Sequence, residues 1–237
     1  MAPTPDTRGG EPHRHDLALT INPAPKFAAA RRTAQNGRMD AALPTAFAAS
    51  LPAWLVAELP ALAATRLPDD DARVALANRL ADRNWREGSG GPFAAIVVDA
   101  ASGELVSVGV NVVLASGLSS THAEVTALSL AQTRLGRWDL GAAGAELDLV
   151  VNWAPCVMCY GATMWSGVRG LVIAGHGEEC SALTGFDEGP MPEDWIGEFE
   201  RRGIRVRSGV RRDEAVDVFR AFGASDAVVY NARGAAD

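Results

Sequence analysis

The stretch from Thr121 to Val168 opens with Thr121-His122-Ala123-Glu124 and later contains Pro155-Cys156-Val157-Met158-Cys159. One imidazole and two thiols are a ligand set that suits a zinc ion. Three protein ligands leave the fourth tetrahedral position open, which is typical of a catalytic rather than a structural zinc. We therefore predict that His122, Cys156 and Cys159 bind a metal. Glu124, two residues after the histidine, is the expected base for a metal-activated water.

The spacing between the two halves of this stretch predicts how they are held together. Cys156 follows His122 by 156 − 122 = 34 residues, about the length of a helix–strand–helix unit. We expect helices at 122–134 and 156–165, with Thr121 as an N-cap and Pro155 at a first helical position. If both helices follow neighbouring parallel strands, their N-termini lie side by side at the carboxyl ends of the strands. The positive end of a helix dipole also favours the thiolate that zinc requires.

A structural zinc site is the alternative interpretation of these ligands. Such a site needs a fourth protein ligand, and His176 and Cys180 are the nearest candidates in the sequence. Without that role, Cys180 is expected to behave as a small buried hydrophobic residue.

The rest of the chain predicts a single α/β domain over residues 41–237. Two β-rich runs, 93–98 and 105–111, flank a turn and predict an antiparallel hairpin. Strands and helices alternate after that hairpin, which favours parallel strands with right-handed crossovers. The predicted fold is a three-layer α/β/α sandwich with a mixed five-stranded sheet. Residues 1–40 lack periodicity and are rich in Pro, Gly and Arg, so we expect a flexible extension, of which residues 1–38 are dispensable for folding.

Composition limits the kinds of partner. The net charge of −7 argues against a broad phosphate-binding face, so no nucleic acid is expected to bind. No run of about 18 apolar residues is present, so no transmembrane helix is expected. The three cysteines give no disulfide framework, and reduced thiols predict a cytoplasmic protein.

The pattern His-x-Glu followed by Pro-Cys-x-x-Cys resembles the signature of zinc-dependent nucleobase deaminases. Over roughly residues 41–233 the chain is similar to the cytidine deaminase-like superfamily, and within it to the guanine deaminases, some of which also act on the triazine ammeline. The segments that carry this resemblance, besides the two already quoted, are Gly90-Gly91-Pro92-Phe93, Asn111, Gly185-Phe186-Asp187-Glu188-Gly189-Pro190 and Tyr230-Asn231.

This resemblance implies a reaction and further site residues. It implies hydrolysis of guanine to xanthine and ammonia, with Glu188 as a second catalytic acid and Asn111 as a substrate contact. It also implies that the tail at Tyr230 closes the pocket, sometimes from the partner subunit of a homodimer.

The residues themselves add two arguments about the substrate. An ionised carboxylate on Asp187 or Glu188 matches the N–H donors of guanine at N1 and the 2-amino group. Cytosine presents an acceptor instead, and the mismatch costs roughly 1–3 kcal/mol. Phe93 and Trp153 are candidates for stacking on a flat base, although each is individually typical of a core residue.

The chain departs from the family pattern at one position, because relatives usually carry Glu where this chain has Ala154. Three alternative functions remain open. A tRNA adenosine deaminase shares the two metal motifs, but the acidic charge of this chain weighs against it. A cytosine or nucleoside deaminase is the second alternative, and a non-catalytic zinc-stabilised binding module is the third. The intact Glu124 argues against the last of these.

Overall fold

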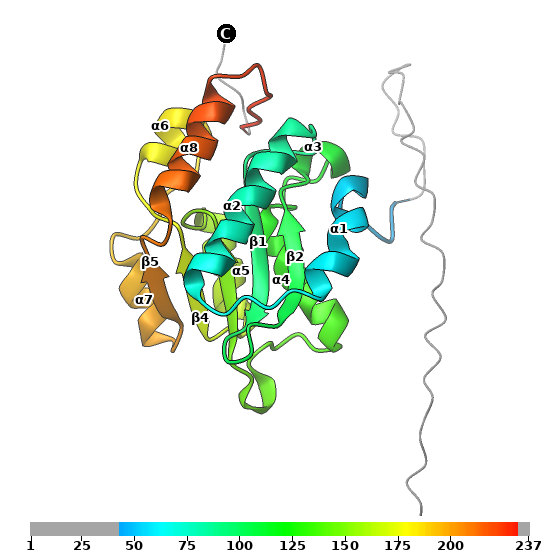
Figure 1. Ribbon diagram of the computed structural model, residues 1–237, viewed down its shortest axis with the longest axis vertical. Helices are drawn as coiled ribbons and strands as arrows, with labels where there is room; N and C mark the ends of the chain where they lie inside the picture. The colour runs from blue at the N-terminus through cyan, green and yellow to red at the C-terminus, as the bar shows by residue number, and fades with distance from the viewer. Residues whose placement is uncertain (1–42, 232–237) are drawn as a thin grey trace, which may run out of the picture. The chain divides into compact units, whose positions relative to one another are not determined.

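The computed structural model describes residues 43–231, so the predicted extension at residues 1–40 lies outside the described residues. A five-stranded sheet with strand order β2-β1-β3-β4-β5 forms the centre of the fold (Figure 1). β1 pairs antiparallel with both β2 and β3, whereas β3, β4 and β5 are parallel. The predicted mixed five-stranded sheet is therefore confirmed. Its strands are β1 (Ala94–Asp99), β2 (Leu105–Val110), β3 (Leu147–Val151), β4 (Gly170–Ile173) and β5 (Arg205–Ser208).

Helices cover both faces of the sheet, as the prediction of three layers requires. In Figure 1, α2 and α8 lie in front of the sheet and α4 and α5 behind it. None of the helices within residues 43–231 combines the length and the apolar character needed to cross a lipid bilayer. The helices are α1 (Ala53–Ala63), α2 (Asp70–Arg86), α3 (Val113–Ser116), α4 (Ala123–Leu135), the 3-10 turn η1 (Ala142–Gly144), α5 (Val157–Ser166), α6 (Glu179–Thr184), α7 (Trp195–Arg201) and α8 (Arg212–Gly223).

Alternating side chains of the strands supply two separate cores. Ile96 of β1 faces the core that α2 and α8 cover, whereas its neighbour Val97 faces the core under α4 and α5. Gly109 of β2 allows α4 to lie directly on the sheet, because a Cβ there would come within 2.4 Å of the backbone of Ala127. The close approach of α4 to β2 places His122, just before α4, over the end of the sheet.

Asp69 caps the start of α2, whereas the two helices of the metal motifs do not begin as predicted. Asp69 caps α2 by accepting a hydrogen bond of 2.8 Å from the backbone N–H of Ala72. Thr121 does not cap α4, because its hydroxyl donates instead to the carbonyl of Leu118 at 2.7 Å. Pro155 precedes α5, whose N-cap position is occupied by Cys156. Both metal motifs thus lie at the start of a helix, and each of the two helices begins one residue later than predicted.

The strands that lead into these two helices are not neighbours, which corrects a second expectation. β2 and β3 point in the same direction, but β1 lies between them and runs the opposite way. The hairpin return explains this order, since β1 pairs with β2 on one side and with β3 on the other. The N-termini of α4 and α5 still meet, because both helices pack on the same face of the sheet.

Candidate active site

The three predicted metal ligands come together at the N-termini of α4 and α5. One ligand atom each from His122, Cys156 and Cys159 lies within 4.8 Å of the others, and Cys156 Sγ is 3.5 Å from His122 Nδ1. Among residues 43–231 this is the only group of three such side chains so arranged, and Cys180 is outside it. Hydrogen bonding from the Cys159 thiol and the His122 ring lowers the pKa of Cys156 to about 4. A thiolate beside an imidazole and a second sulfur fits zinc, and it leaves one tetrahedral position without a protein ligand.

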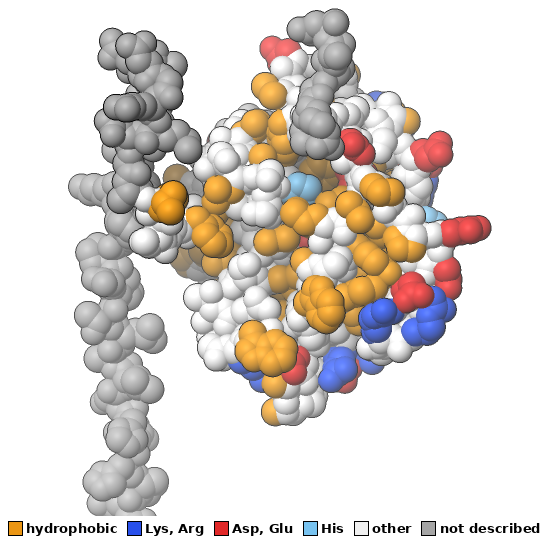
Figure 2. Space-filling model, turned by 180° about the vertical axis from the view of Figure 1, so that it is seen from behind, with side chains coloured by type: hydrophobic (Ala, Val, Ile, Leu, Met, Phe, Trp, Pro, Cys, Tyr) orange, Lys and Arg blue, Asp and Glu red, His pale blue; other side chains and the backbone are white. Residues whose placement is uncertain are grey.

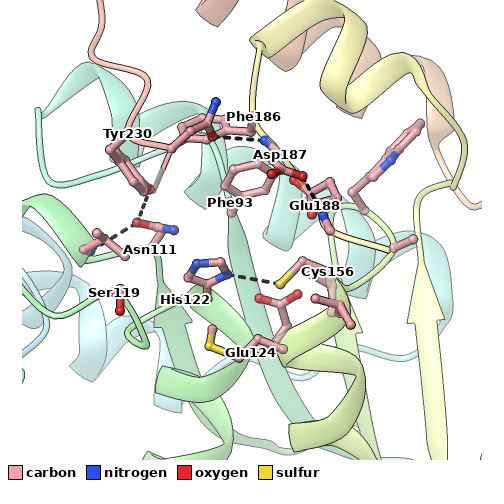
Figure 3. Close-up of a pocket in the computed structure, with 18 of the residues that line it drawn as sticks. Phe93, Asn111, Ser119, His122, Glu124, Cys156, Phe186, Asp187, Glu188 and Tyr230 are labelled. Carbon is pink, nitrogen blue, oxygen red and sulfur yellow. Dashed lines mark hydrogen bonds between the residues drawn. The ribbon is translucent and has the colours of Figure 1, made fainter. Parts of the chain in front are cut away.

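Glu124 lies in the first turn of α4, and its carboxylate points toward the ligand cluster (Figure 3). Only 6% of its surface is exposed. Burial, followed by the nearby charge of Cys156, raises the pKa of Glu124 to about 7. A carboxyl that can gain and lose a proton near neutral pH is suited to proton transfer.

Glu188 also lies close to the ligand cluster, on the side of the pocket opposite Asn111 and Tyr230 (Figure 3). Its loop is fixed to α5, because the Glu188 carbonyl accepts a hydrogen bond of 3.0 Å from the N–H of Val157. That N–H is one of the first-turn donors that a helix leaves unpaired. Burial raises the pKa of the Glu188 carboxyl to about 7, helped by the charges of Cys156 and Glu124.

Cys180 is buried in the hydrophobic core, as expected, and it also contacts Glu188. Its thiol, 1% exposed in α6, donates to Glu188 Oε1 across 3.7 Å. The sequence around Cys180 does not indicate this contact, because Cys180 and Glu188 come together only through the turn that follows α6.

Asn111 and Tyr230 form the wall facing Glu188. The oxygen of the Asn111 side chain accepts hydrogen bonds from the Tyr230 hydroxyl and from the Val113 N–H, the second at 3.2 Å. Both bonds use the oxygen, and Figure 3 shows the amide nitrogen of Asn111 on the pocket side. The Tyr230 hydroxyl itself accepts from the Gly91 N–H at 3.0 Å. The wall thus offers one N–H donor group whose orientation is fixed.

Asn231 fastens the end of the described chain to the loop that carries Glu188. Its side-chain oxygen accepts from the Asp187 N–H at 3.0 Å, and its nitrogen donates to the Gly185 carbonyl at 2.8 Å. The Asp187 carboxylate is used locally, because it accepts from the Gly189 N–H at 2.9 Å. Tyr230 and Asn231 therefore connect the two walls of the pocket.

The pocket between these walls has a volume of about 550 Å³. It is lined by all five residues predicted to contact substrate, by both predicted catalytic carboxylates, and by two of the three metal ligands, while Cys159 lies beneath its surface at 0% exposure. Ala154, where relatives usually have Glu, lines it as well. Trp153 is 2% exposed and packs edge-on against Phe219, so most of its ring belongs to the core. The lining residues of the predicted set are Phe93, Asn111, His122, Glu124, Trp153, Cys156, Asp187, Glu188 and Tyr230.

Other lining residues were not predicted from the sequence. Val157 and Met158 lie between the metal cysteines, and Gly117 and Ser119 belong to the loop before α4. The position of Met158 inside the Cys-x-x-Cys motif is a signal that could have been used. The loop at Gly117 and Ser119 carries no such signal, because its place depends on how β2 ends.

Comparison with known proteins shows extensive similarity. The family model for the cytidine and deoxycytidylate deaminase zinc-binding region matches residues 68–175. The solved structure of guanine deaminase from Nitrosomonas europaea is 40% identical, with a TM-score of 0.71. The match covers 78% of this chain and 100% of that one. A variant of the protein NE0047, solved in complex with 8-azaguanine, is 41% identical with a TM-score of 0.71, over 77% of this chain and 99% of the other.

A curated relative matches over a shorter region. Guanine deaminase from Bacillus subtilis strain 168 is 34% identical over 109 residues, which is 46% of this chain. The matched region spans 65% of that relative's length.

Proposed function

Because the chain belongs to the cytidine and deoxycytidylate deaminase family, as a zinc-dependent deaminase of the guanine deaminase type, we propose that it hydrolyses guanine to xanthine and ammonia. The observation that carries this proposal is the position of Glu124. It is a buried carboxylate beside a His-Cys-Cys cluster, and both face a pocket large enough for a purine base.

His122, Cys156 and Cys159 hold the zinc in this proposal. When bound, zinc lowers the pKa of a coordinated water toward about 7, so that hydroxide is available at working pH. The oxygen of the attacking water adds to C2 while Glu124 accepts one proton of that water and passes it to the ring nitrogen. Glu124 then takes the proton of the hydroxyl now on C2 and delivers it to the amine, so that a carbonyl forms as the amine departs. The C2–N bond then breaks and ammonia leaves, because protonation spares the leaving group from departing as a strongly basic amide ion.

Groups on the two walls orient the base. The amide nitrogen of Asn111 offers a donor to the ring, and its oxygen is already held by Tyr230 and Val113. Glu188, with Asp187 beside it, supplies the acceptor that suits the N–H groups of guanine. Phe93 and Trp153 both line the pocket, and the half-buried Phe93 offers an aromatic face to a flat base.

Glu188→Gln is expected to lower kcat for guanine about 10²-fold or more, because the amide can neither handle a proton nor accept from both N–H donors. Steady-state kinetics on the zinc-loaded protein measure this effect. Asp187→Asn is the matched comparison in the same loop. Its carboxylate is exposed and bonded to the Gly189 N–H, so a smaller loss is expected. Unchanged guanine turnover in Glu188→Gln removes Glu188 from the mechanism.

A substrate panel tests the proposed reaction against its alternatives. Ammonia release is measured with guanine, ammeline, cytosine, adenine and a tRNA anticodon stem. Guanine is expected to have the highest kcat/KM, with ammeline as an accepted analogue. The highest rate with cytosine or with the tRNA stem contradicts the proposal in favour of the corresponding alternative, and no ammonia from any of the five favours a binding module.

We also propose a cytoplasmic homodimer. Hydrophobic side chains gather on the α4–α5 side of the molecule, which Figure 2 views from behind. Trp165 and Trp138 are 82% and 78% exposed there, an arrangement that favours a protein partner. Sedimentation equilibrium at micromolar concentration is expected to give twice the chain mass, and a monomer contradicts this part of the proposal. The three unpaired cysteines suit a reducing compartment.

A further inference from the structure

We propose that Asn84, which does not line the pocket, is a positioning residue that holds Asn111 in place for the substrate. This inference rests on the proposed function, since it concerns the wall that orients the base. Asn84 lies in the last turn of α2 and is fully buried at 0% exposure.

The Asn84 side chain joins two separate segments of the pocket wall. Its amide nitrogen donates to the carbonyl of Gly91 at 2.9 Å and to the carbonyl of Asn111 at 2.8 Å. The amide has two N–H hydrogens, and each is used for one of these bonds. One buried group therefore sets the distance between the segment before β1 and the segment after β2.

These bonds close a ring with the residues that line the pocket. The Gly91 N–H donates to the Tyr230 hydroxyl, which donates to the side-chain oxygen of Asn111. Asn84 connects the remaining two corners, the Gly91 and Asn111 carbonyls. The ring has four members, of which Asn111 and Tyr230 line the pocket and Asn84 and Gly91 lie behind them. Asn84 holds the backbone carbonyl of Asn111 directly, and it acts on the Asn111 side chain through Gly91 and Tyr230. In this way a residue outside the pocket controls the direction of the Asn111 amide nitrogen.

The segments at Gly91 and Asn111 are in close contact, so small shifts of the backbone cannot replace the two hydrogen bonds from Asn84. A Cβ at Gly90 would lie 2.3 Å from the Asn111 carbonyl oxygen, so the two segments are already in direct contact. Removing the Asn84 amide leaves the buried Asn111 carbonyl without a donor, whereas the Gly91 carbonyl keeps the Phe93 N–H at 2.8 Å. The segment at Asn111 is therefore expected to move to find a new partner for its carbonyl.

Asn78 provides a matched control on the same helix. It is also buried, at 3% exposure, and its amide nitrogen likewise donates to two groups. Those groups are the Arg211 carbonyl at 3.4 Å and the Glu214 carboxylate at 3.5 Å, at the start of α8 and outside the pocket lining. Asn78→Ala therefore removes a comparable buried amide without touching the ring.

The experiment compares Asn84→Ala with Asn78→Ala in the zinc-loaded full chain. In Asn84→Ala, KM for guanine is expected to rise about tenfold or more while kcat changes less, because binding contacts are misplaced and the proton-transfer groups are not. Asn78→Ala is expected to lose similar thermal stability with KM within about twofold of the parent chain. If Asn84→Ala does not fold, Asn84→Ser gives the same comparison with a smaller loss of polar contact.

Amide hydrogen exchange gives a readout that does not depend on turnover. The Gly91 and Val113 N–H groups, which bond to Tyr230 and Asn111, are expected to exchange faster in the Asn84 variant than in the Asn78 variant. Equal KM values and equal exchange rates in the two variants overturn the inference. If the parent chain releases no ammonia from guanine, the proposed function fails, and the exchange comparison still decides whether Asn84 positions Asn111.

Discussion

Glu124→Gln is expected to retain its zinc and to lose turnover by about 10²–10⁴-fold for each proton transfer that Glu124 performs. Glutamine has nearly the same shape, so the N-terminus of α4 and the ligand His122 stay in place. The amide cannot accept the proton of the attacking water, nor can it deliver one to the departing amine. With two transfers assigned to one carboxylate, this is the largest effect expected from any single substitution outside the ligands.

Zinc content and kcat must be measured on the same preparation of this variant. Glu87→Gln serves as the control, because Glu87 lies at the exposed end of α2, with 42% of its side chain accessible, and pairs with Arg83. The control is expected to match the parent chain in both measurements. A fully zinc-loaded Glu124→Gln protein with near-normal turnover contradicts the role given to this carboxylate.

Cys159→Ser is expected to lose most of its bound zinc and, with it, about 10³-fold or more of the turnover. Serine is similar in size, but its hydroxyl keeps its proton near neutral pH and is a poor ligand for zinc compared with a thiolate. Cys159 is fully buried in the first turn of α5, so no other side chain can move in to replace its sulfur.

Cys180→Ser is the matched control for the metal content. Cys180 is equally buried and unpaired but lies outside the ligand cluster, so the Cys180 variant is expected to bind one zinc per chain. Metal analysis after dialysis against a weak chelator separates the two variants. Full zinc in Cys159→Ser, or zinc loss in Cys180→Ser, means that the ligands have been assigned wrongly.

The ligand set could be predicted from the sequence because its information is local. His122 and Glu124 lie two residues apart, and Cys156 and Cys159 lie three residues apart. Only a few side-chain types bind zinc, so residues of these types at such spacings indicate a zinc site. The hairpin and the parallel strands were also predicted correctly from nearby residues. The predicted starts of α4 and α5 were wrong by one residue. Thr121 favours an N-cap and Pro155 a first helical position, but the geometry of the preceding turns overrides both preferences.

Residues whose role depends on the folded chain could not be predicted in this way. Asn84 is an ordinary polar residue near the end of an amphipathic helix, and its partners Gly91 and Asn111 become visible only when β1 and β2 are in place. Cys180 contacts Glu188 because of the turn between them, and the sequence does not predict the shape of that turn. The insertion of β1 between β2 and β3 likewise follows from hairpin pairing over the whole sheet and from no single motif.

X-ray absorption at the zinc edge of the full chain tests the ligand arrangement most directly. The site described above predicts one zinc per chain with two sulfur ligands at about 2.3 Å and one imidazole nitrogen at about 2.0–2.1 Å. It also predicts a single light ligand that exchanges when 8-azaguanine or guanine is added. A third sulfur, a fourth ligand from the protein, or the absence of zinc would contradict an open catalytic site at His122, Cys156 and Cys159.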